Sequence, residues 1–381
     1  MTGTEQRPEI VLVSSGHHAL DHRIFDKEAR TLARHFQVRV VASHTRDETR
    51  QGVQITALRP YRSRLDRFLR LPLSCYLAAR GPGPRVLILC DAELLVWAPL
   101  ARALGWRVIY DAHEDFSRLM LRRTWIPGPL RGVVGRLGGV EKQLSASCDG
   151  VMAATEALVE NFDHPHRHAV HNLPTREFLA KARATSLPMA DREFDVVHLG
   201  TLSDERLDFL IPVLHAMLAV RPQATALVLG LTGAQARRMR AEFSSASVTV
   251  IGKVSYARIP RFLGTCRIGI DVHPILYPHL LCAVPVKVFE YMANGSAVVT
   301  SYLPELHRLL GADGARHVVT VTEPAPAAYA AEIDRLLSDP AGLEARQAAL
   351  LGLVQERWNW GAEEDGLVRF VSEIALNGSG A

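Results

Sequence analysis

The chain has 381 residues, about twice the usual size of one domain, so we expect either two domains or one large α/β domain. Its composition, 48% hydrophobic and 22% charged, excludes a largely disordered or collagen-like protein. The formal net charge of +4 is compatible with partners that carry phosphate groups but does not indicate a dedicated nucleic-acid binder.

The cysteines and the first residues indicate the compartment. The five cysteines are odd in number and widely spaced, without a C-x-x-C pair that could bind zinc or exchange disulfides. We therefore expect buried free thiols in a reducing compartment. The first residues lack a basic stretch followed by an apolar segment of signal-peptide length. Both observations favour a cytoplasmic protein.

Short apolar runs alternate with helical patterns in the first half of the chain. We expect strands at residues 9–14, 38–42, 85–90, 107–110 and 150–153. Between the first two, Phe25, Ala29, Leu32 and Phe36 recur at helical spacing. This alternation predicts a parallel sheet that is covered on both faces.

A second series of the same kind follows. Residues 173–191 hold two prolines and no strand pattern, which predicts a linker. We then expect strands at residues 194–199, 226–229, 248–251, 268–272, 297–300 and 317–321. Two successive open α/β domains predict a cleft between them, where such folds usually bind ligands.

Common catalytic signatures are absent from the sequence. It has no P-loop, no H-E-x-x-H, no G-x-S-x-G and no G-x-G-x-x-G, which argues against P-loop nucleotide use, zinc hydrolysis and ordinary NAD binding. It also has no D-x-D triplet, which disfavours a sugar-nucleotide site built on a carboxylate-bound divalent metal. A bound phosphate would then be held by Arg, Lys and backbone N–H groups at helix N-termini.

The most informative segment is residues 284–300. Lys287 and Glu290 lie three residues apart at the start of a predicted helix, so their side chains share one face. Lys near a helix N-terminus can bind phosphate, and a carboxylate one turn later can accept ribose hydroxyls, so the pattern suits a nucleoside diphosphate. An exposed salt bridge between the two side chains explains the spacing equally well.

The pattern P-x-K-x-x-E-Y-M-A-x-G-x-x-V-V at residues 285–299 resembles the donor-site signature of family 4 retaining glycosyltransferases, which have the GT-B fold. Further segments resemble the family in order and spacing. They are D-H-R-I at 21–24 with Glu28 and Leu32, Y-D-A-H-E at 110–114, N-L-P at 172–174, G-T-L at 200–202 with Arg206, and W-N-W at 358–360. The resemblance spans residues 9–375.

The resemblance implies an architecture and a division of labour. GT-B proteins consist of two Rossmann-like, doubly wound parallel-sheet domains that face a central cleft. We accordingly expect an acceptor-binding domain at residues 1–175 and a donor-binding domain at residues 192–355. Residues 356–381 would return to the N-terminal domain through a C-terminal helix.

The resemblance also implies roles for single residues. As catalytic groups, Arg206 and Lys287 would neutralise the departing diphosphate, and His113 would reach the transferred sugar. Glu290 would bind the donor ribose. The donor site would further include Gly16, Gly200, Thr201 and Val286, and the acceptor side Ser15, His17, Asp21, Arg23 and Glu114. In this retaining chemistry the departing phosphate takes the acceptor proton on the same face, so electrostatic stabilisation is the main contribution of the protein.

Three positions depart from the family pattern. Cys282 stands where many members have a Glu that contacts the sugar, and Thr201 where many have Arg. A single glycine, Gly16, replaces the pair often found in the first loop. These departures leave the sugar open, and with it the alternative of a catalytically silent member.

Histidines and arginines allow other interpretations. His17, His18 and His22 cluster near the first loop without cysteines, so we expect a polar lining there and no metal. The histidines of residues 164–171 are expected in a solvated loop. Outside its motif, His113 would be interpreted as a partly buried structural histidine.

Two arginine-rich, partly amphipathic stretches fall in the N-terminal half. They are residues 59–71 and residues 118–131, the latter around Trp125-Ile126-Pro127. They could contact an anionic membrane that carries a lipid-linked acceptor. The interpretation that we favour is that they are solvated faces of a protein whose 44 basic residues include only five lysines.

We therefore expect a retaining glycosyltransferase of the hexosyltransferase type that uses a nucleoside-diphosphate sugar and needs no metal or other cofactor. The arginine-rich, lysine-poor composition is typical of GC-rich coding and favours a small-molecule acceptor in secondary-metabolite, antibiotic-type biosynthesis. The alternatives are a peripheral membrane glycosyltransferase of cell-surface glycan assembly and a silent nucleotide-sugar-binding partner. The motifs do not encode the base, the sugar, the acceptor nucleophile or the oligomeric state.

Overall fold

The computed structural model describes residues 8–63, 65–80, 85–116, 118, 139–244 and 246–376, and of Phe68 only the backbone. The chain divides into two compact units, residues 1–172 with 361–381 and residues 173–360. Some residues of the arginine-rich stretches lie outside the described residues, namely Arg64, Arg122, Arg123, Arg131 and the Trp125-Ile126-Pro127 segment.

The first unit is built on an eight-stranded sheet with the order β3-β4-β2-β1-β5-β6-β7-β8. Its strands are β1 (Glu9–His18), β2 (Gln37–Ser43), β3 (Glu48–Arg50), β4 (Val53–Leu58), β5 (Arg85–Leu89), β6 (Arg107–Ala112), β7 (Gly150–Ala153) and β8 (Arg167–Ala169). Among the described strands of this sheet, only β3 and β4 pair antiparallel. The strand order reverses between β1 and β5, because the chain extends the sheet through β2 on one side and through β5 on the other.

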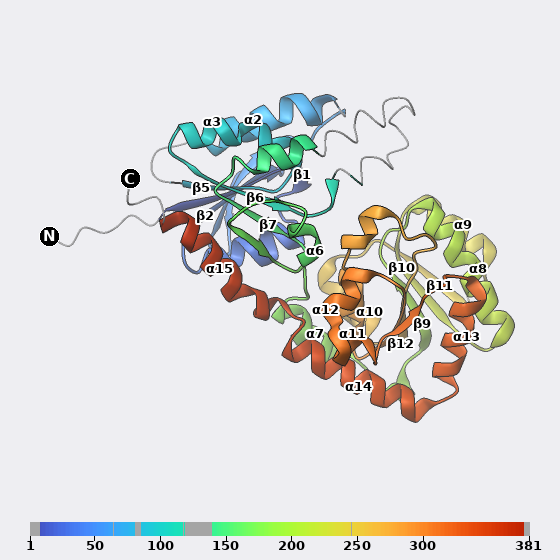
Figure 1. Cartoon of the computed structure of the whole chain (residues 1–381). Helices are drawn as coiled ribbons and strands as arrows, with labels where there is room; N and C mark the ends of the chain where they lie inside the picture. The colour runs from blue at the N-terminus through green and yellow to red at the C-terminus, as the bar shows by residue number, and fades with distance from the viewer. Residues whose placement is uncertain are drawn as a thin grey trace. The chain divides into compact units, whose positions relative to one another are not determined.

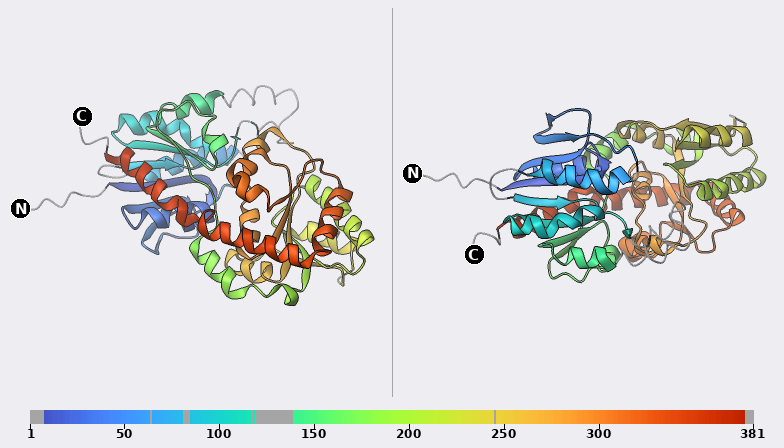
Figure 2. Two further views of the ribbon diagram at one scale, coloured as in Figure 1. Left: turned by 60° about the horizontal axis from the view of Figure 1, so that its bottom comes forward. Right: turned by 90° about the horizontal axis from the view of Figure 1, so that it is seen from above.

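Helices cover both faces of this sheet. They include the π-helix η1 (His22–Ala29), α1 (Arg30–Leu32), the π-helix η2 (Asp66–Arg70), α2 (Leu71–Ala79), the 3-10 helix η3 (Ala92–Trp97), α3 (Ala98–Ala103), α6 (Glu156–Val159) and α15 (Trp360–Leu376). α2 and α3 lie over one face and α15 over the other (Figure 1). α15 runs across β7 (Figure 2), where a Cβ on Gly150 would lie 2.8 Å from the Phe370 ring.

The second unit is built on six parallel strands in the order β11-β10-β9-β12-β13-β14, which reverses between β9 and β12. The strands are β9 (Phe194–Leu199), β10 (Ala226–Leu231), β11 (Val248–Gly252), β12 (Cys266–Asp271), β13 (Ala297–Ser301) and β14 (Val319–Val321). The helices are α7 (Arg176–Thr185), η4 (Met189–Asp191), α8 (Asp204–Val220), α9 (Gly233–Glu242), η5 (Tyr256–Arg258), α10 (Ile259–Leu263), η6 (Pro278–Cys282), α11 (Val286–Ala293), α12 (Pro304–Ala315), α13 (Pro326–Leu337) and α14 (Pro340–Glu356).

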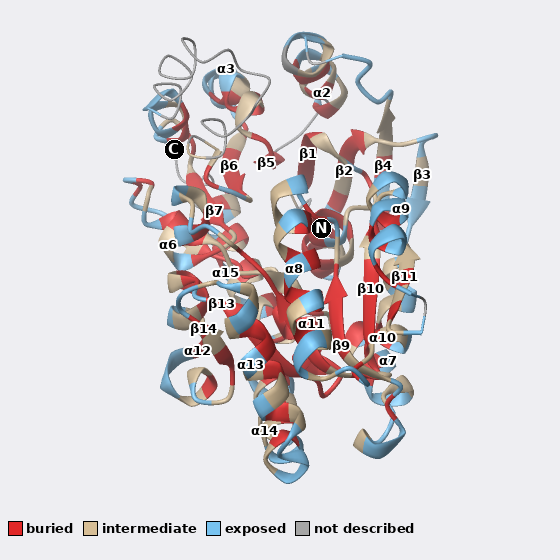
Figure 3. Ribbon diagram, turned by 90° about the vertical axis from the view of Figure 1, so that its right-hand side faces the viewer, coloured by how far each residue is buried: buried red, intermediate tan, exposed pale blue. Residues whose placement is uncertain are grey.

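Consecutive residues of the central strands point to opposite faces, and both faces are apolar. Val196 of β9 packs in a cluster with Leu210 of α8, whereas Val197 packs in a second cluster with Val288 of α11. Figure 3 shows β9 and β10 largely buried among the helices. A strand that is buried on both faces is typical of parallel sheets. The predicted fold class, two doubly wound parallel sheets, is confirmed.

The segment predicted as a linker folds as part of the second unit. The chain enters that unit at Leu173, and α7 buries Phe178 and Ala182 in its core. The hydroxyl of Thr175 caps α7 by accepting the backbone N–H of Phe178, so the proline just before it precedes the helix and does not interrupt it.

Other local features also differ from expectation. The strands β3, β4 and β8 are not among the predicted ones, and β3 and β8 have only three residues each, too few for a periodic pattern. His164 and His171, expected in a solvated loop, are buried. The five cysteines are free and buried, as predicted. None of the helices among the described residues combines the length and apolar character needed to cross a membrane.

Candidate functional site

The motif residues of the second unit gather at the carboxyl ends of β9 and β12, where the strand order reverses. Open parallel sheets bind ligands preferentially at such a point. β9 leads through Gly200 and Thr201 into α8, whose first turn carries Arg206. α11 begins at Val286 and carries Lys287, whose Nζ would lie 3.8 Å from a Cβ built on Gly200.

A carboxylate outside the motifs, Asp271, joins the two predicted cations. It ends β12 and is fully buried. Its Oδ1 lies 2.8 Å from Nη2 of Arg206 and 3.2 Å from Nζ of Lys287. Its Oδ2 lies 3.0 Å from Nε2 of His273. Arg206 also donates from Nε to the carbonyl of Val272 at 2.7 Å. The two cations are thus held together at one point.

Burial and opposite charges set the protonation of this cluster. Burial alone would raise the pKa of Asp271, but His273, Lys287 and Arg206 hold it well below its usual value. Burial lowers the pKa of Lys287, and Asp271 only partly offsets this. Burial and the two cations lower the pKa of His198 well below its usual range, so this β9 histidine is neutral at pH 7.

α11 places Glu290 one turn after Lys287. The helix follows Pro285 and has no side-chain cap, and the N–H groups of such a first turn suit an anion. Val286, the first residue of the helix, is half-buried. Glu290 is 5% exposed, and the side chain of Lys287 is 15% exposed. An exposed salt bridge therefore does not describe this pair.

Tyr291, the next residue of α11, ties the two central strands together where they separate. Its hydroxyl accepts the backbone N–H of Leu199 at 2.8 Å and donates to the carbonyl of Ile270 at 3.1 Å. The ring fills the space over Gly269, where a Cβ would overlap it at 2.2 Å. Tyr291 thus fixes the strand ends that carry Gly200 and Asp271.

Gly230, at the end of β10, permits the close approach of the loop after β9. Its φ is +102°, and a Cβ there would lie 3.1 Å from the backbone of Gly200. We expect Gly230→Ala to lower the free energy of unfolding by about 1–3 kcal/mol, because alanine is strained in this region. Urea unfolding tests this against Gly252→Ala, whose added Cβ meets its nearest neighbour at 3.8 Å. Equal stability of both variants would contradict the expectation.

In the first unit, the carboxyl end of β1 encloses a carboxylate that follows β5, again where the strand order reverses. Oδ2 of Asp91 accepts the hydroxyl of Ser14 at 2.6 Å and the backbone N–H groups of Ser15 and Gly16 at 2.8 and 3.0 Å. A Cβ on Gly16 would lie 2.5 Å from Oδ1 of Asp91. A side chain at position 16 would therefore displace the ends of the Asp91 and Arg67 side chains, and Asp91 is a candidate site residue outside the motifs.

The acceptor-side residues Ser15, His17 and Asp21 lie at this end of β1 or just after it. The hydroxyl of Ser15 donates to Glu93 at 2.9 Å, and Arg67 reaches the same oxygen at 2.9 Å. Nδ1 of His17 lies 3.4 Å from Oδ2 of Asp21, which caps η1. The structure brings these polar groups together at one edge of the sheet, and their roles toward a substrate stay predictions.

Arg23, predicted on the acceptor side, is 4% exposed and holds an internal network. It lies 2.8 Å from Asp111 through Nη2, 2.9 Å from Glu28 through Nε, and donates from Nη1 to a backbone carbonyl. Nε2 of His113 lies 2.6 Å from the other oxygen of Asp111. Glu114 is exposed and is not part of this network.

Glu28 holds a proton more readily than Asp111 does. Burial, and then Asp111, raise the pKa of Glu28 well above its usual value, whereas Arg23 and His113 hold the pKa of Asp111 below its usual value. We expect Glu28→Gln to change the free energy of unfolding by less than about 1 kcal/mol, because the amide keeps a donor and an acceptor in the same volume. Urea unfolding at pH 7 measures this. Asp111→Asn, which removes a charge, should cost more, and a larger loss in the Glu28 variant would contradict the assignment.

Among the described residues, one group has metal-ligand spacing. The ligand atoms of Cys90, Asp111 and His113 lie within 4.8 Å of one another. Burial raises the pKa of the Cys90 thiol well above its usual value. Asp111 already pairs with Arg23, whose positive charge opposes a bound cation. The group is therefore a poor ligand set for a divalent metal.

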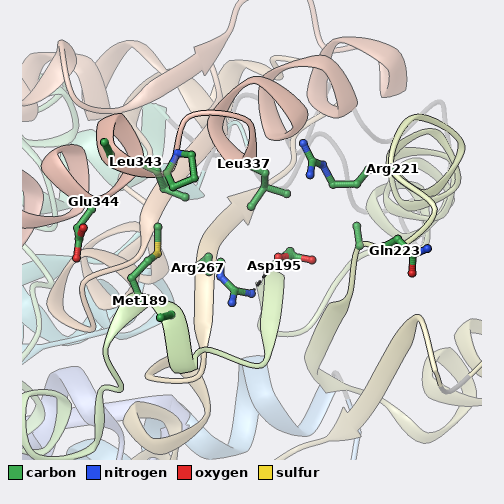
Figure 4. A pocket seen from close by; sticks show the side chains of 12 residues that line it. Met189, Asp195, Arg221, Gln223, Arg267, Leu337, Leu343 and Glu344 are labelled. Atoms are coloured by element: carbon green, nitrogen blue, oxygen red, sulfur yellow. Dashed lines mark hydrogen bonds and ion pairs between the residues drawn. The ribbon is translucent and has the colours of Figure 1, made fainter.

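A pocket of about 520 Å³ lies at the opposite end of the second unit's sheet (Figure 4). Its lining includes Asp195 and Arg267, near the amino ends of β9 and β12, which pair at 3.0 Å. Arg221 and Glu344 also line the pocket, so its lining carries two positively and two negatively charged side chains. None of the motif residues lines it. The candidate site is therefore the opposite edge, where the strands end.

Known proteins share this fold. Solved structures that match over nearly the whole chain include sucrose-phosphate synthase from Thermosynechococcus elongatus, with 18% identity, TM-score 0.71, and coverage of 97% of this chain and 99% of that one. An α,α-trehalose-phosphate synthase (UDP-forming) from Burkholderia vietnamiensis has 14% identity, TM-score 0.71, and coverage of 99% and 100%. Anabaena HepE in complex with UDP-glucose has 13% identity, TM-score 0.70, and coverage of 96% and 100%.

At these identities the likeness shows the fold, which is GT-B. No curated protein sequence matches the chain. The family model of glycosyl transferases group 1 matches residues 193–339, which hold the six-stranded sheet and the cluster around Asp271. The predicted resemblance is thus confirmed: the chain has the GT-B fold, and residues 193–339 of its second unit match the family model of glycosyl transferases group 1.

Proposed function

We propose that the chain transfers a sugar, with retention and without a metal, from a nucleoside-diphosphate donor to a small-molecule acceptor. The observation that carries the proposal is the meeting of Arg206 and Lys287 at the carboxyl ends of the central strands, within 3.2 Å of one carboxylate oxygen. Two cations beside the uncapped start of α11 suit a diphosphate. The same cations take the place that a divalent metal would have in stabilising the leaving group.

Arg206 and Lys287 would act on the leaving group. As the bond between the sugar and the diphosphate breaks, negative charge grows on the phosphate oxygens, and preorganised cations stabilise that charge. Asp271 keeps Arg206 and Lys287 oriented before the donor arrives, and the phosphate oxygens then share them. Glu290 accepts hydrogen bonds from the ribose. In retaining transfer the departing phosphate takes the proton of the acceptor hydroxyl.

Structures of the same fold support the choice of donor. Anabaena HepE has been solved with UDP and glucose and with UDP-glucose, and one trehalose-phosphate synthase with glucose-6-phosphate. These ligands favour a nucleotide sugar and a small-molecule acceptor for this chain as well. Retention follows from the family resemblance, and the assignment to secondary-metabolite biosynthesis follows only from composition.

We assign the acceptor to the first unit, at the carboxyl end of β1. Ser15 and His17 lie at this end, and the ring of His113 lies 5.1 Å from that of His17. His113 is oriented by Asp111 and would face the transferred sugar. Arg23 would act only indirectly, because it is buried and holds Asp111.

Turnover tests the proposal. The protein is incubated with UDP-, GDP-, dTDP- and ADP-glucose and a panel of sugar, sugar-phosphate and aglycone acceptors, and release of the nucleoside diphosphate and the anomeric configuration of the product are measured. We expect turnover with one base, with retained configuration, that survives EDTA and is abolished by Glu290→Ala.

Two results would contradict the proposal. Tight binding of a nucleotide sugar without release of the diphosphate on any acceptor would favour a silent nucleotide-sugar-binding partner. Turnover that is undiminished in Glu290→Ala would place the donor elsewhere.

A further inference from the structure

Exposed leucines form a row along η2 and α2 in the first unit. Leu65, Leu69, Leu73 and Leu77 recur every four residues, which puts them on one side of the helix. Leu65 is 73% exposed and Leu69 is 70% exposed. The opposite side of α2 faces the protein interior, since Leu71 and Cys75 are buried. Single exposed leucines are common, but a row along one helix marks an interaction surface.

A second row lies on the neighbouring helices. Val96, Leu100 and Leu104 of the η3–α3 segment are also exposed and also four residues apart. The two segments lie side by side, because the ring of Tyr76 in α2 stacks on Trp97 of η3 at 4.7 Å. α2 and α3 cover the same face of the sheet (Figure 1). The two rows therefore belong to one surface, which we call the α2–α3 surface.

The charges that border this surface are predominantly positive. Residues 59–80 contain six arginines and a single carboxylate, Asp66. Arg59, Arg62 and Arg80 are exposed, whereas Asp66 is engaged by Arg70. Aliphatic side chains flanked by arginines before and after the η2–α2 segment match the two layers of an anionic bilayer, the acyl chains and the headgroups.

We propose that the α2–α3 surface is a docking site for an anionic lipid bilayer, which attaches the protein to the membrane without spanning it. The leucine rows enter the interface, and Arg59, Arg62 and Arg80 contact the lipid phosphates. A second copy of the chain fits less well, because a twofold interface through this surface would bring the same arginines against each other. The proposal concerns attachment and does not depend on glycosyl transfer.

The test is sedimentation of the full chain with vesicles. The probes are vesicles of pure phosphatidylcholine and of phosphatidylcholine with 30% phosphatidylglycerol. We expect binding to the anionic vesicles only, weakened at high salt because surface charges are screened. The triple variant R59Q/R62Q/R80Q should bind much more weakly, by about fivefold for each arginine removed.

The leucine row is tested with L65Q/L69Q. Both side chains are mostly exposed, so the fold should tolerate the change, and we expect at least about a tenfold loss of vesicle binding. The matched control is Val220→Gln in the second unit, an apolar residue that is 55% exposed and should bind like the wild type. Hydrogen exchange should show protection of residues 65–79 when vesicles are added.

Three outcomes would overturn the proposal. One is equal binding to neutral and anionic vesicles. Another is anionic binding that L65Q/L69Q leaves intact. The third combines two results: the wild type does not bind vesicles, and analytical ultracentrifugation without lipid shows a dimer that L65Q/L69Q dissociates. The surface would then bind a second copy of the chain.

Discussion

Replacing Lys287 with methionine should lower the rate of glycosyl transfer about 10²- to 10³-fold, the usual effect of removing one group that stabilises a developing oxyanion. Methionine keeps an unbranched side chain of nearly the same length and removes the charge and the N–H donors. The remaining cation, Arg206, still contacts Asp271, so the site keeps its shape. The loss should appear mainly in kcat, because the charge on the diphosphate develops as the bond to the sugar breaks.

The measurement is the steady-state release of nucleoside diphosphate from the donor that the wild type uses. The matched control is Lys181→Met, which changes an exposed lysine of α7 and should leave kcat and KM unchanged. A Lys287→Met enzyme with wild-type kcat would show that this lysine does not contact the leaving group.

The second large effect is on stability. Asp271→Asn should lower the free energy of unfolding by about 3–5 kcal/mol, as breaking a buried ion pair usually does. The variant leaves Arg206 and Lys287 without their shared countercharge. The amide can still hydrogen-bond, but it cannot offset the desolvation of two cations.

The pH dependence of this effect has a definite sign. The pKa of Asp271 in the folded protein is held well below its usual value, while in the unfolded chain it is about 3.9. Its stabilising contribution is therefore fully present above about pH 4 and is lost as the pH falls towards the folded pKa. The difference between wild type and Asp271→Asn should be largest near pH 7 and shrink in acid.

Urea unfolding across this pH range measures both effects. Asp208→Asn is the control, because Asp208 forms an exposed ion pair with Arg238 at 2.6 Å, worth less than about 1 kcal/mol. If both asparagine variants cost the same at pH 7, then Asp271 does not hold the two cations as the geometry implies.

The sequence contains enough information to predict the sheets but not all of their strands. Central strands such as β9 and β12 are continuous apolar runs, because helices cover both of their faces. Edge strands such as β3 and β8 span three residues and leave no periodic signal. The sequence does not predict α7, because the segment is largely polar and has a proline on either side, although Thr175 caps the helix.

The candidate site can be predicted from the sequence where its residues lie at a fixed, short spacing. Lys287 and Glu290 belong to one helical turn and are visible in the sequence. Asp271 and Tyr291 are not, because their partners lie far away in the chain: Asp271 binds Arg206 across 65 residues and Tyr291 binds Leu199 across 92. A signal for Asp271 does exist, since a carboxylate at the end of an apolar strand needs a partner once it is buried.

The first unit shows the opposite case, in which the sequence contains the motif but does not indicate the internal network that its residues form. Arg23 and Asp111 both belong to segments that resemble the family, and we expect Arg23 on the acceptor side. In the structure Arg23 is buried on Asp111 and Glu28. A family motif can therefore contain residues that support a site from inside the protein, as well as residues that contact a ligand.

Binding of nucleoside diphosphates tests the central claim most directly. Isothermal titration with UDP, GDP, dTDP and ADP, without metal, is run on the wild type, on Lys287→Met and on the Lys181→Met control. We predict that one of the four binds the wild type and the control with equal affinity and binds Lys287→Met at least about tenfold more weakly. Equal affinity for all three proteins, or no binding of any of the four, would contradict a donor site at the carboxyl ends of β9 and β12.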